Sequence, residues 1–132
     1  MESSATRNIH PELTWKILGC ALEVHKVLGP GLLEGTYRRC LVHELQLRGM
    51  KVDVEVPISI AYKGLKVDPS YRADLIVENT CLLELKAAES IGPVHCLQTL
   101  TYLRLARLPV GLLINFNVAR LKDGIRRFAN LP

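Results

Sequence analysis

The sequence predicts an α/β fold in which a mixed central sheet is flanked by helices. Two stretches near the N-terminus carry apolar residues at helical spacing, short strand-like segments fill the middle, and a third helical stretch precedes the continuous apolar run 110–116. The order is therefore α, α, β, β, β, α, β, which favours one sheet covered by helices. We expect residues 12–132 to form a single domain with an extra N-terminal helix, and residues 1–11 to form a flexible tail.

Three helices are predicted from apolar stripes and from the residues that end them. The first runs from residue 11 or 14 to about 28, where Gly29-Pro30-Gly31 stops it; the second spans about 32–48 and the third about 94–108. The expected core positions are Ile17, Ala21, Val24 and Leu28 in the first helix, Leu41 and Leu45 in the second, and Leu97, Leu100, Thr101 and Leu105 in the third.

Several segments alternate or run apolar in the manner of strands. Residues 51–56 form the first, and residues 58–62 continue after Pro57 until Lys63-Gly64 turns the chain back. The remaining expected strands are 72–78, 81–87 and 110–116, with 121–128 as a last short strand or turn.

Length, composition and charge restrict the class of protein. A chain of 132 residues with 48% hydrophobic and 23% charged residues is long and apolar enough to fold around one core. Only 5% of the residues are aromatic, which argues against a base-stacking platform, while the net charge of +4 fits a polyanionic partner without requiring one. The four cysteines form no C-x-x-C pair, so structural zinc is not expected. We see no apolar leader and no run long enough to span a bilayer, and we expect a soluble, cytoplasmic protein without a membrane partner.

Asp74 and the segment Glu84-Leu85-Lys86 place three ionisable groups inside apolar strands, where burial is costly. If residues 78–80 form a three-residue hairpin loop, Asp74 falls directly opposite Glu84, with the two Cβ atoms about 5 Å apart. Two like charges so placed repel each other unless a cation or a proton lies between them. Period-two alternation also puts Glu84 and Lys86 on one face of their strand.

A divalent metal held by two carboxylates, with a lysine beside it, is the chemistry of metal-dependent phosphodiester cleavage. The pattern therefore predicts a nuclease core around Asp74, Glu84 and Lys86. Two alternatives stay open from the residues alone. Lys86 could simply pair with one of the carboxylates, and a loop one residue longer or shorter would put the carboxylates on opposite faces.

Polar side chains on the predicted helices are further candidates. Glu34 either favours the start of its helix or points inward as a third metal ligand, with Tyr37 one turn on to hydrogen-bond or pack beside it. His25 is more often a packing residue than a ligand in such a position. Gln98 and Tyr102 share a helical face with His95, and this face points either to the site or to solvent. The sequence also carries scattered cations, most of which we expect at the solvated surface while several could grip phosphates: Arg38, Arg39, Arg48, Arg104, Arg107, Lys122, Arg126 and Arg127.

An ordered set of segments resembles a known family. Residues 31–37, Gly-Leu-Leu-Glu-Gly-Thr-Tyr, resemble the signature of the GxxExxY proteins, a group within the PD-(D/E)XK nuclease superfamily. The resemblance covers about residues 12–130. Its other parts are His25, Leu28-Gly29-Pro30-Gly31, Glu44-Leu45, Tyr62-Lys63-Gly64, Tyr71-Arg72-Ala73-Asp74-Leu75, Glu84-Leu85-Lys86, Gln98 with Tyr102, and Leu113-Ile114-Asn115-Phe116.

The resemblance implies a restriction-endonuclease-like α-β-β-β-α-β core and a set of roles for its residues. Asp74 and Glu84 would be the main ligands of Mg²⁺ or Mn²⁺, with Glu34 and the Leu85 backbone carbonyl as further ligands. Lys86 would orient or activate the attacking water and stabilise developing charge.

Gln98 and Tyr102 look like the Q-x-x-x-Y element of RecB-type nucleases, which flanks the metal site and contacts the nucleic acid. His25 resembles a recurrent histidine of the group whose role stays open. We therefore expect a metal-dependent nuclease acting on nucleic acid, with DNA as the first choice of substrate. A domain this small could also need a homodimer or a protein partner. The alternatives are a binding module that keeps the fold without cutting, and a structural protein with a buried ion pair between Glu84 and Lys86.

Overall fold

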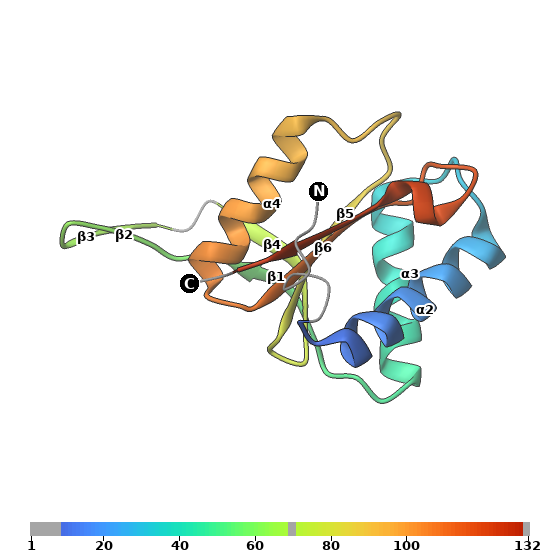
Figure 1. The fold of residues 1–132 in the computed structure, drawn as a ribbon, viewed down its shortest axis with the longest axis horizontal. Coiled ribbons are helices and arrows are strands. Elements are labelled where there is room, and N and C mark those ends of the chain that lie inside the picture. The colour runs from blue at the N-terminus through green and yellow to red at the C-terminus, as the bar shows by residue number, and fades with distance from the viewer. Residues whose placement is uncertain (1–8, 69–70, 131–132) are drawn as a thin grey trace.

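The computed structural model describes residues 9–68 and 71–130 and has a five-stranded sheet at its centre (Figure 1). The strand order is β1-β4-β5-β6-β7, in which β5 and β6 are parallel and the other neighbours are antiparallel. The expected mixed sheet is therefore confirmed, while residues 1–8 of the expected tail lie outside the described residues. The strand bounds are β1 Val52–Pro57, β4 Arg72–Val77, β5 Cys81–Lys86, β6 Val110–Asn115 and β7 Ile125–Ala129.

Helices cover both faces of this sheet (Figure 1). The pair α2 (Pro11–Leu28) and α3 (Glu34–Leu47) packs on one face. The crossover helix between the parallel strands, α4 (Pro93–Ala106), packs on the other face. Thus α3, β1, β4, β5, α4 and β6 follow the expected α-β-β-β-α-β order, and α2 is the extra N-terminal helix. None of the helices that the structure describes has both the length and the apolarity needed to cross a membrane.

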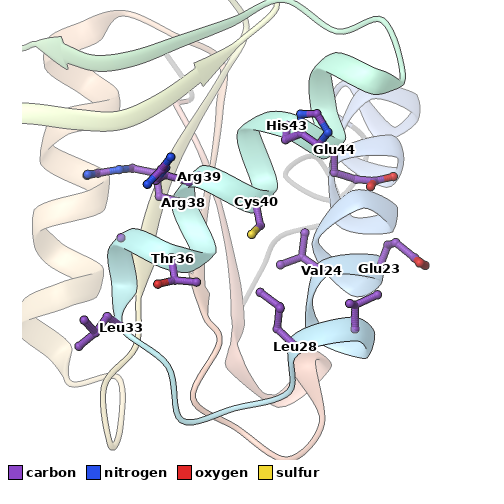
Figure 2. Close-up of a pocket in the computed structure, with 12 residues that line it drawn as sticks. Glu23, Val24, Leu28, Leu33, Thr36, Arg38, Arg39, Cys40, His43 and Glu44 are labelled. Atoms are coloured by element: carbon purple, nitrogen blue, oxygen red, sulfur yellow. The ribbon is translucent and has the colours of Figure 1, made fainter.

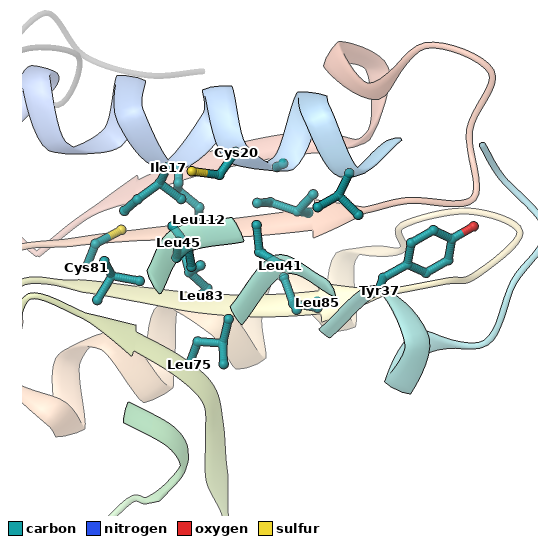
Figure 3. Packing of buried hydrophobic residues seen from close by; sticks show 14 of the residues in the cluster. Ile17, Cys20, Tyr37, Leu41, Leu45, Leu75, Cys81, Leu83, Leu85 and Leu112 are labelled. Atoms are coloured by element: carbon teal, nitrogen blue, oxygen red, sulfur yellow. The ribbon is translucent and has the colours of Figure 1, made fainter. Parts of the chain in front are cut away.

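The larger core lies between the sheet and the α2–α3 pair (Figure 3). Ile17 and Ala21 from α2, and Leu41 and Leu45 from α3, are fully buried there. Each fully buried Ile or Leu contributes about 2 kcal/mol relative to an exposed one. The apolar stripes of the first two helices thus point to the core as predicted. The strand residues that meet them are Leu75, Val77, Cys81, Leu83, Leu85, Leu112 and Ile114.

The predicted core face of the third helix is wrong in part. Leu97 and Leu105 are 64% and 39% exposed, and the buried side chains of α4 are Thr99, Tyr102 and Leu103. Apolar residues occur all around this helix, so their spacing does not select one face. Thr99 can be buried because its hydroxyl donates to a backbone carbonyl one turn earlier, at 2.8 Å.

The strand expected at 58–62 does not join the central sheet. In the part of the chain that the structure describes, β2 (Ile60–Tyr62) pairs with β3 (Leu65–Val67) alone, in a hairpin that projects from the sheet (Figure 1). Lys63 and Gly64 form its turn, with φ values of 46° and 85°. Positive φ at both central residues is typical of the type I′ turn, whose twist matches that of the strands.

The short strand expected near the C-terminal end is confirmed. A 3₁₀ turn at Leu121–Gly124 leads into β7, which pairs antiparallel with β6. Gly124 is required in this turn, because a Cβ at this position would overlap the backbone carbonyl oxygen of Asn115. The turn therefore packs directly against the end of β6.

Candidate active site

The β4–β5 hairpin has the register that a three-residue loop predicts. Val77 lies opposite Cys81 at the loop. Asn79 in the loop has a φ of 50°, a left-handed conformation that asparagine adopts more readily than most residues. The same register places Asp74 opposite Glu84, so the alternative in which the two carboxylates face away from each other is excluded.

Each carboxylate of this pair is fixed by a backbone N–H group of the opposite strand. Glu84 Oε2 accepts a hydrogen bond from the Asp74 N–H at 3.0 Å, and Asp74 Oδ2 accepts one from the Leu85 N–H at 2.7 Å. The paired register of the strands ends at Leu75 and Leu83, so beyond this point side-chain oxygens hold the strands together. Because the N–H and C=O of one strand residue point to the same side, the Leu85 carbonyl faces the same gap.

The Glu84 carboxyl is held in an environment that disfavours its charge. Its residue is only 6% exposed. Burial, the negative charge of Asp74 and a hydrogen bond with the Asp74 carboxyl raise the pKa of Glu84 to about 8, although the Asp74 N–H and Lys86 act in the opposite direction. Without a cation, the environment of Glu84 therefore favours its protonated form.

The charges around the Asp74–Glu84 pair also act on Glu34, which lies at the first position of α3. Burial and the charge of Asp74 raise its pKa, and the cations of Lys86 and Arg38 lower it. The Glu34 carboxyl is thus within electrostatic range of the pair. However, within residues 9–68 and 71–130 no three His, Cys, Asp or Glu side chains converge into one metal-holding group. The structure brings Asp74 and Glu84 together and leaves Glu34 outside their immediate cluster.

Lys86 ends β5 next to the carboxylate pair and is half-buried. In the described part of the chain, no carboxylate oxygen lies within 4.0 Å of its Nζ atom. The alternative in which Lys86 forms an ion pair with Glu84 or Asp74 is therefore not observed. Its charge still acts on the Glu84 and Glu34 carboxyls, so the ammonium group is near the site without being tied to either acid.

Arg38 is a site residue that sequence reasoning did not single out. Its Nη1 atom lies 3.2 Å from Glu55 Oε1 and 4.0 Å from Asp74 Oδ1. Glu55 has a φ of 50°, at the point where the β1–β4 register omits the Glu55–Asp74 pair. The local signal was the spacing of Arg38 four residues after Glu34, which puts both on one face of α3.

The site thus combines two opposed acids, Asp74 and Glu84, with the adjacent Lys86. The sequence model of the PD-(D/E)XK nuclease superfamily matches residues 11–128. The chain belongs to this superfamily. The pattern in its name, an acid followed by acid-x-Lys, fits Asp74 and Glu84-Leu85-Lys86. No curated protein and no solved structure matches the chain. Membership in a superfamily of nucleases implies nucleic acid as the class of substrate.

Gln98 and Tyr102 lie on the α4 side of the PD-(D/E)XK residues. Gln98 Nε2 donates a hydrogen bond to the Tyr102 hydroxyl oxygen at 3.0 Å. Burial and the negative charges of Glu84 and Asp74 raise the pKa of Tyr102, which places its hydroxyl near the carboxylates. The Nδ1 atom of His95, one turn before Gln98, accepts a hydrogen bond from the Gly92 N–H at the start of α4, at 3.4 Å.

Tyr37 and His25 hold loops rather than reaching the carboxylates with their hydrogen bonds. The fully buried Tyr37 donates its hydroxyl to the Gly29 carbonyl at 2.6 Å and stacks on Phe116, with ring centres 4.7 Å apart. His25 Nε2 is 2.8 Å from the Val118 carbonyl oxygen. In this chain, Tyr37 therefore fixes the loop before α3, and His25 fixes the loop after β6.

A pocket of about 900 Å³ lies between α2 and α3 (Figure 2). None of the three PD-(D/E)XK side chains lines it. Its walls combine apolar residues such as Val24 and Leu33 with Arg38 and His43. Arg38 is thus shared between this pocket and the carboxylate site.

Asn115 supports the strand end that carries Lys86. It lies opposite Lys86 at the end of β6 and is 1% exposed. Its Oδ1 atom accepts from the Ala88 N–H at 3.0 Å and from the Asn117 N–H at 3.2 Å, and its Nδ2 donates to the Ala88 carbonyl at 2.9 Å. One side chain therefore fixes the backbone that follows β5. The sequence offered Asn115 only as part of the family resemblance, without a role.

We expect Asn115→Ala to lower the free energy of unfolding by about 2–4 kcal/mol, because two partly buried N–H groups lose their partner and the Ala88 carbonyl loses the shorter of its two side-chain contacts. Chemical denaturation in urea measures this change. Asn117→Ala is the matched control, since its amide makes a single contact of 3.4 Å with the Ala88 carbonyl, and should cost less than about 1 kcal/mol. Equal costs for the two variants would contradict the assigned role of Asn115.

Proposed function

We propose that this protein is a metal-dependent nuclease of the GxxExxY group, which hydrolyses phosphodiester bonds in nucleic acid, DNA in the first instance. One observation carries the proposal: two opposed carboxylates, Asp74 and Glu84, are fixed by backbone N–H groups next to Lys86, which has no acidic partner within ion-pair distance in the described residues. A structural hairpin gains nothing from placing two like charges together. The arrangement is useful when a cation and a phosphate enter the site.

The donor set fits Mg²⁺ or Mn²⁺. Asp74 and Glu84 supply hard carboxylate oxygens, the Leu85 carbonyl would add a further oxygen, and no His or Cys of the described residues joins them in a metal-holding group. Glu34 would complete the charge of the site from a greater distance. When bound, the metal supplies positive charge at the scissile phosphate and lowers the pKa of a nearby water.

The cationic side chains would act on the substrate directly. The Lys86 ammonium would orient the attacking water and stabilise negative charge that develops on the phosphate. Arg38 would hold a phosphate oxygen in exchange for its contact with Glu55. Tyr102, whose hydroxyl is oriented by Gln98, offers a hydrogen bond to the nucleic-acid backbone on the α4 side.

The test is cleavage of labelled single- and double-stranded DNA by the wild-type protein with Mg²⁺ or Mn²⁺, and with EDTA as the metal-free arm. We expect cutting that requires the metal. Asp74→Ala, purified in the same way, should lose both cutting and Mn²⁺ binding by calorimetry, because it removes one of the two carboxylates. Absence of cutting together with absence of Mn²⁺ binding by the wild type would contradict the proposal and leave a binding module.

A further inference from the structure

The β2–β3 hairpin, residues 60–67, forms an arm that pairs with no other strand in the part of the chain that the structure describes. Its strands pair with each other and project from the central sheet (Figure 1). An isolated two-stranded hairpin is marginally stable in water. Tyr62 and Leu65 lie opposite each other across the hairpin and are 60% and 61% exposed. The arm therefore presents apolar surface that the rest of residues 9–68 and 71–130 does not cover.

The charges on the arm are all positive. Lys63 lies at the turn and Lys66 on β3, and residues 57–67 contain no acidic side chain. The Lys63 Nζ atom lies 5.3 Å from the centre of the Tyr62 ring, so a cation and an aromatic face are presented together at the tip. A purely apolar partner would leave the two ammonium groups without counter-charges. A nucleic-acid strand supplies both phosphates for the lysines and flat rings for the tyrosine.

The arm begins and ends beside the candidate active site. It is inserted between β1 and β4, the strands that carry Glu55 and Asp74. Tyr71, just before β4, packs against Tyr102 with ring centres 6.0 Å apart. Tyr102 in turn feels the charges of Glu84 and Asp74. A polyanion that crosses the site would therefore pass the base of the arm.

We infer that the β2–β3 hairpin is a nucleic-acid-binding arm, in which Lys63 and Lys66 contact phosphates and Tyr62 packs against the sugar or base beside them. The inference rests on the proposed function, since it adds a binding element to the same site. A two-stranded β-ribbon fits the major groove of a duplex. The arm would thus give this small domain a second contact with the nucleic acid, next to the bond that is cut.

The experiment measures binding of a fluorescein-labelled DNA duplex by fluorescence anisotropy. Ca²⁺ replaces Mg²⁺, so that binding is measured independently of cleavage. For the double variant Lys63→Ala/Lys66→Ala we expect the Kd to rise about tenfold and the slope of log K against log salt to fall by about two. The matched control Lys16→Ala/Lys26→Ala removes two exposed lysines of α2 and should stay within about twofold of wild type. Tyr62→Ala should weaken binding while the salt slope stays unchanged.

Binding and cleavage are measured separately, so the arm and the nuclease proposal can fail separately. If the nuclease proposal alone is wrong, no variant cuts DNA, yet the Lys63→Ala/Lys66→Ala variant still loses affinity. If the arm is wrong, this variant keeps the wild-type affinity and salt slope. The inference is also overturned if the wild type binds neither duplex nor single-stranded DNA. It is overturned in favour of a second copy of the chain if the wild type sediments as a dimer that Tyr62→Ala/Leu65→Ala makes monomeric.

Discussion

Replacing Lys86 with alanine is expected to slow DNA cleavage at least about a thousandfold while leaving Mn²⁺ affinity within about threefold of wild type. The two effects separate because Asp74 and Glu84 hold their positions through backbone N–H groups and not through the lysine. The lysine is positioned by its strand, whose end Asn115 fixes. Single-turnover cleavage at saturating DNA measures the first effect, and calorimetric titration with Mn²⁺ measures the second.

Lys16→Ala is the control for this variant, since it removes an exposed lysine from α2 and should leave cleavage unchanged. Lys86→Ala should also keep its fold, with less than about 1 kcal/mol lost from the free energy of unfolding, because no ion pair in the described residues is broken. Cleavage within tenfold of wild type would show that Lys86 is not a catalytic residue. Loss of Mn²⁺ binding would show that the lysine orders the carboxylates after all.

The opposed acids could be predicted from the sequence because the information that places them is local. Asp74 and Glu84 are joined by one short loop, and a three-residue loop, which the structure has, puts both on the same face. The inner faces of α2 and α3 were predictable for a similar reason, since their apolar stripes are one-sided. Local pattern therefore sufficed for the two carboxylates, for the lysine two residues further on, and for the core beneath them.

Other features depend on contacts between distant parts of the chain, which no local sequence pattern predicts. Residues 58–62 have strand composition, but nothing in them shows that β2 will pair with β3 outside the sheet. The contact of Arg38 with Glu55 and Asp74 joins three separate elements, so the arginine looked like one cation among eight. On α4, apolar residues on every side concealed the buried face, to which Tyr102 belongs. Tertiary packing decides each of these cases.

Without metal, the protein is expected to lose stability as the pH rises from about 4.5 to about 8, and Glu84→Gln is expected to remove much of this loss. The pKa of Glu84 is raised from 4.5 to about 8 in the folded protein. Between these values the folded state keeps a proton that the unfolded state has released, so the free energy of unfolding falls by up to about 1.4 kcal/mol per pH unit. Below this range both states are protonated and the penalty is absent; above it both are ionised and the penalty is constant.

The comparison of Glu84→Gln with wild type isolates this group from the other ionisable residues. At pH 5 the two proteins should be nearly equally stable, and at pH 9 the variant should be more stable by a few kcal/mol, because glutamine accepts the Asp74 N–H without carrying a charge. Urea denaturation at each pH, with EDTA present, gives both curves. Parallel curves would contradict the raised pKa.

The affinity for metal should depend on the same Glu84 proton, but it should rise with pH where the free energy of unfolding falls. Because the ionised Glu84 is the form that binds, the affinity for Mn²⁺ should rise about tenfold per pH unit toward pH 8 and then level off. At pH 6.5 each binding event should release about one proton, which calorimetry detects as a heat that changes with the ionisation enthalpy of the buffer. Glu84→Gln, which is more stable at high pH, should bind the metal poorly and cut no DNA. Binding that is independent of pH would mean that Glu84 is already ionised in the free protein, and the pair would then carry both charges before the metal arrives.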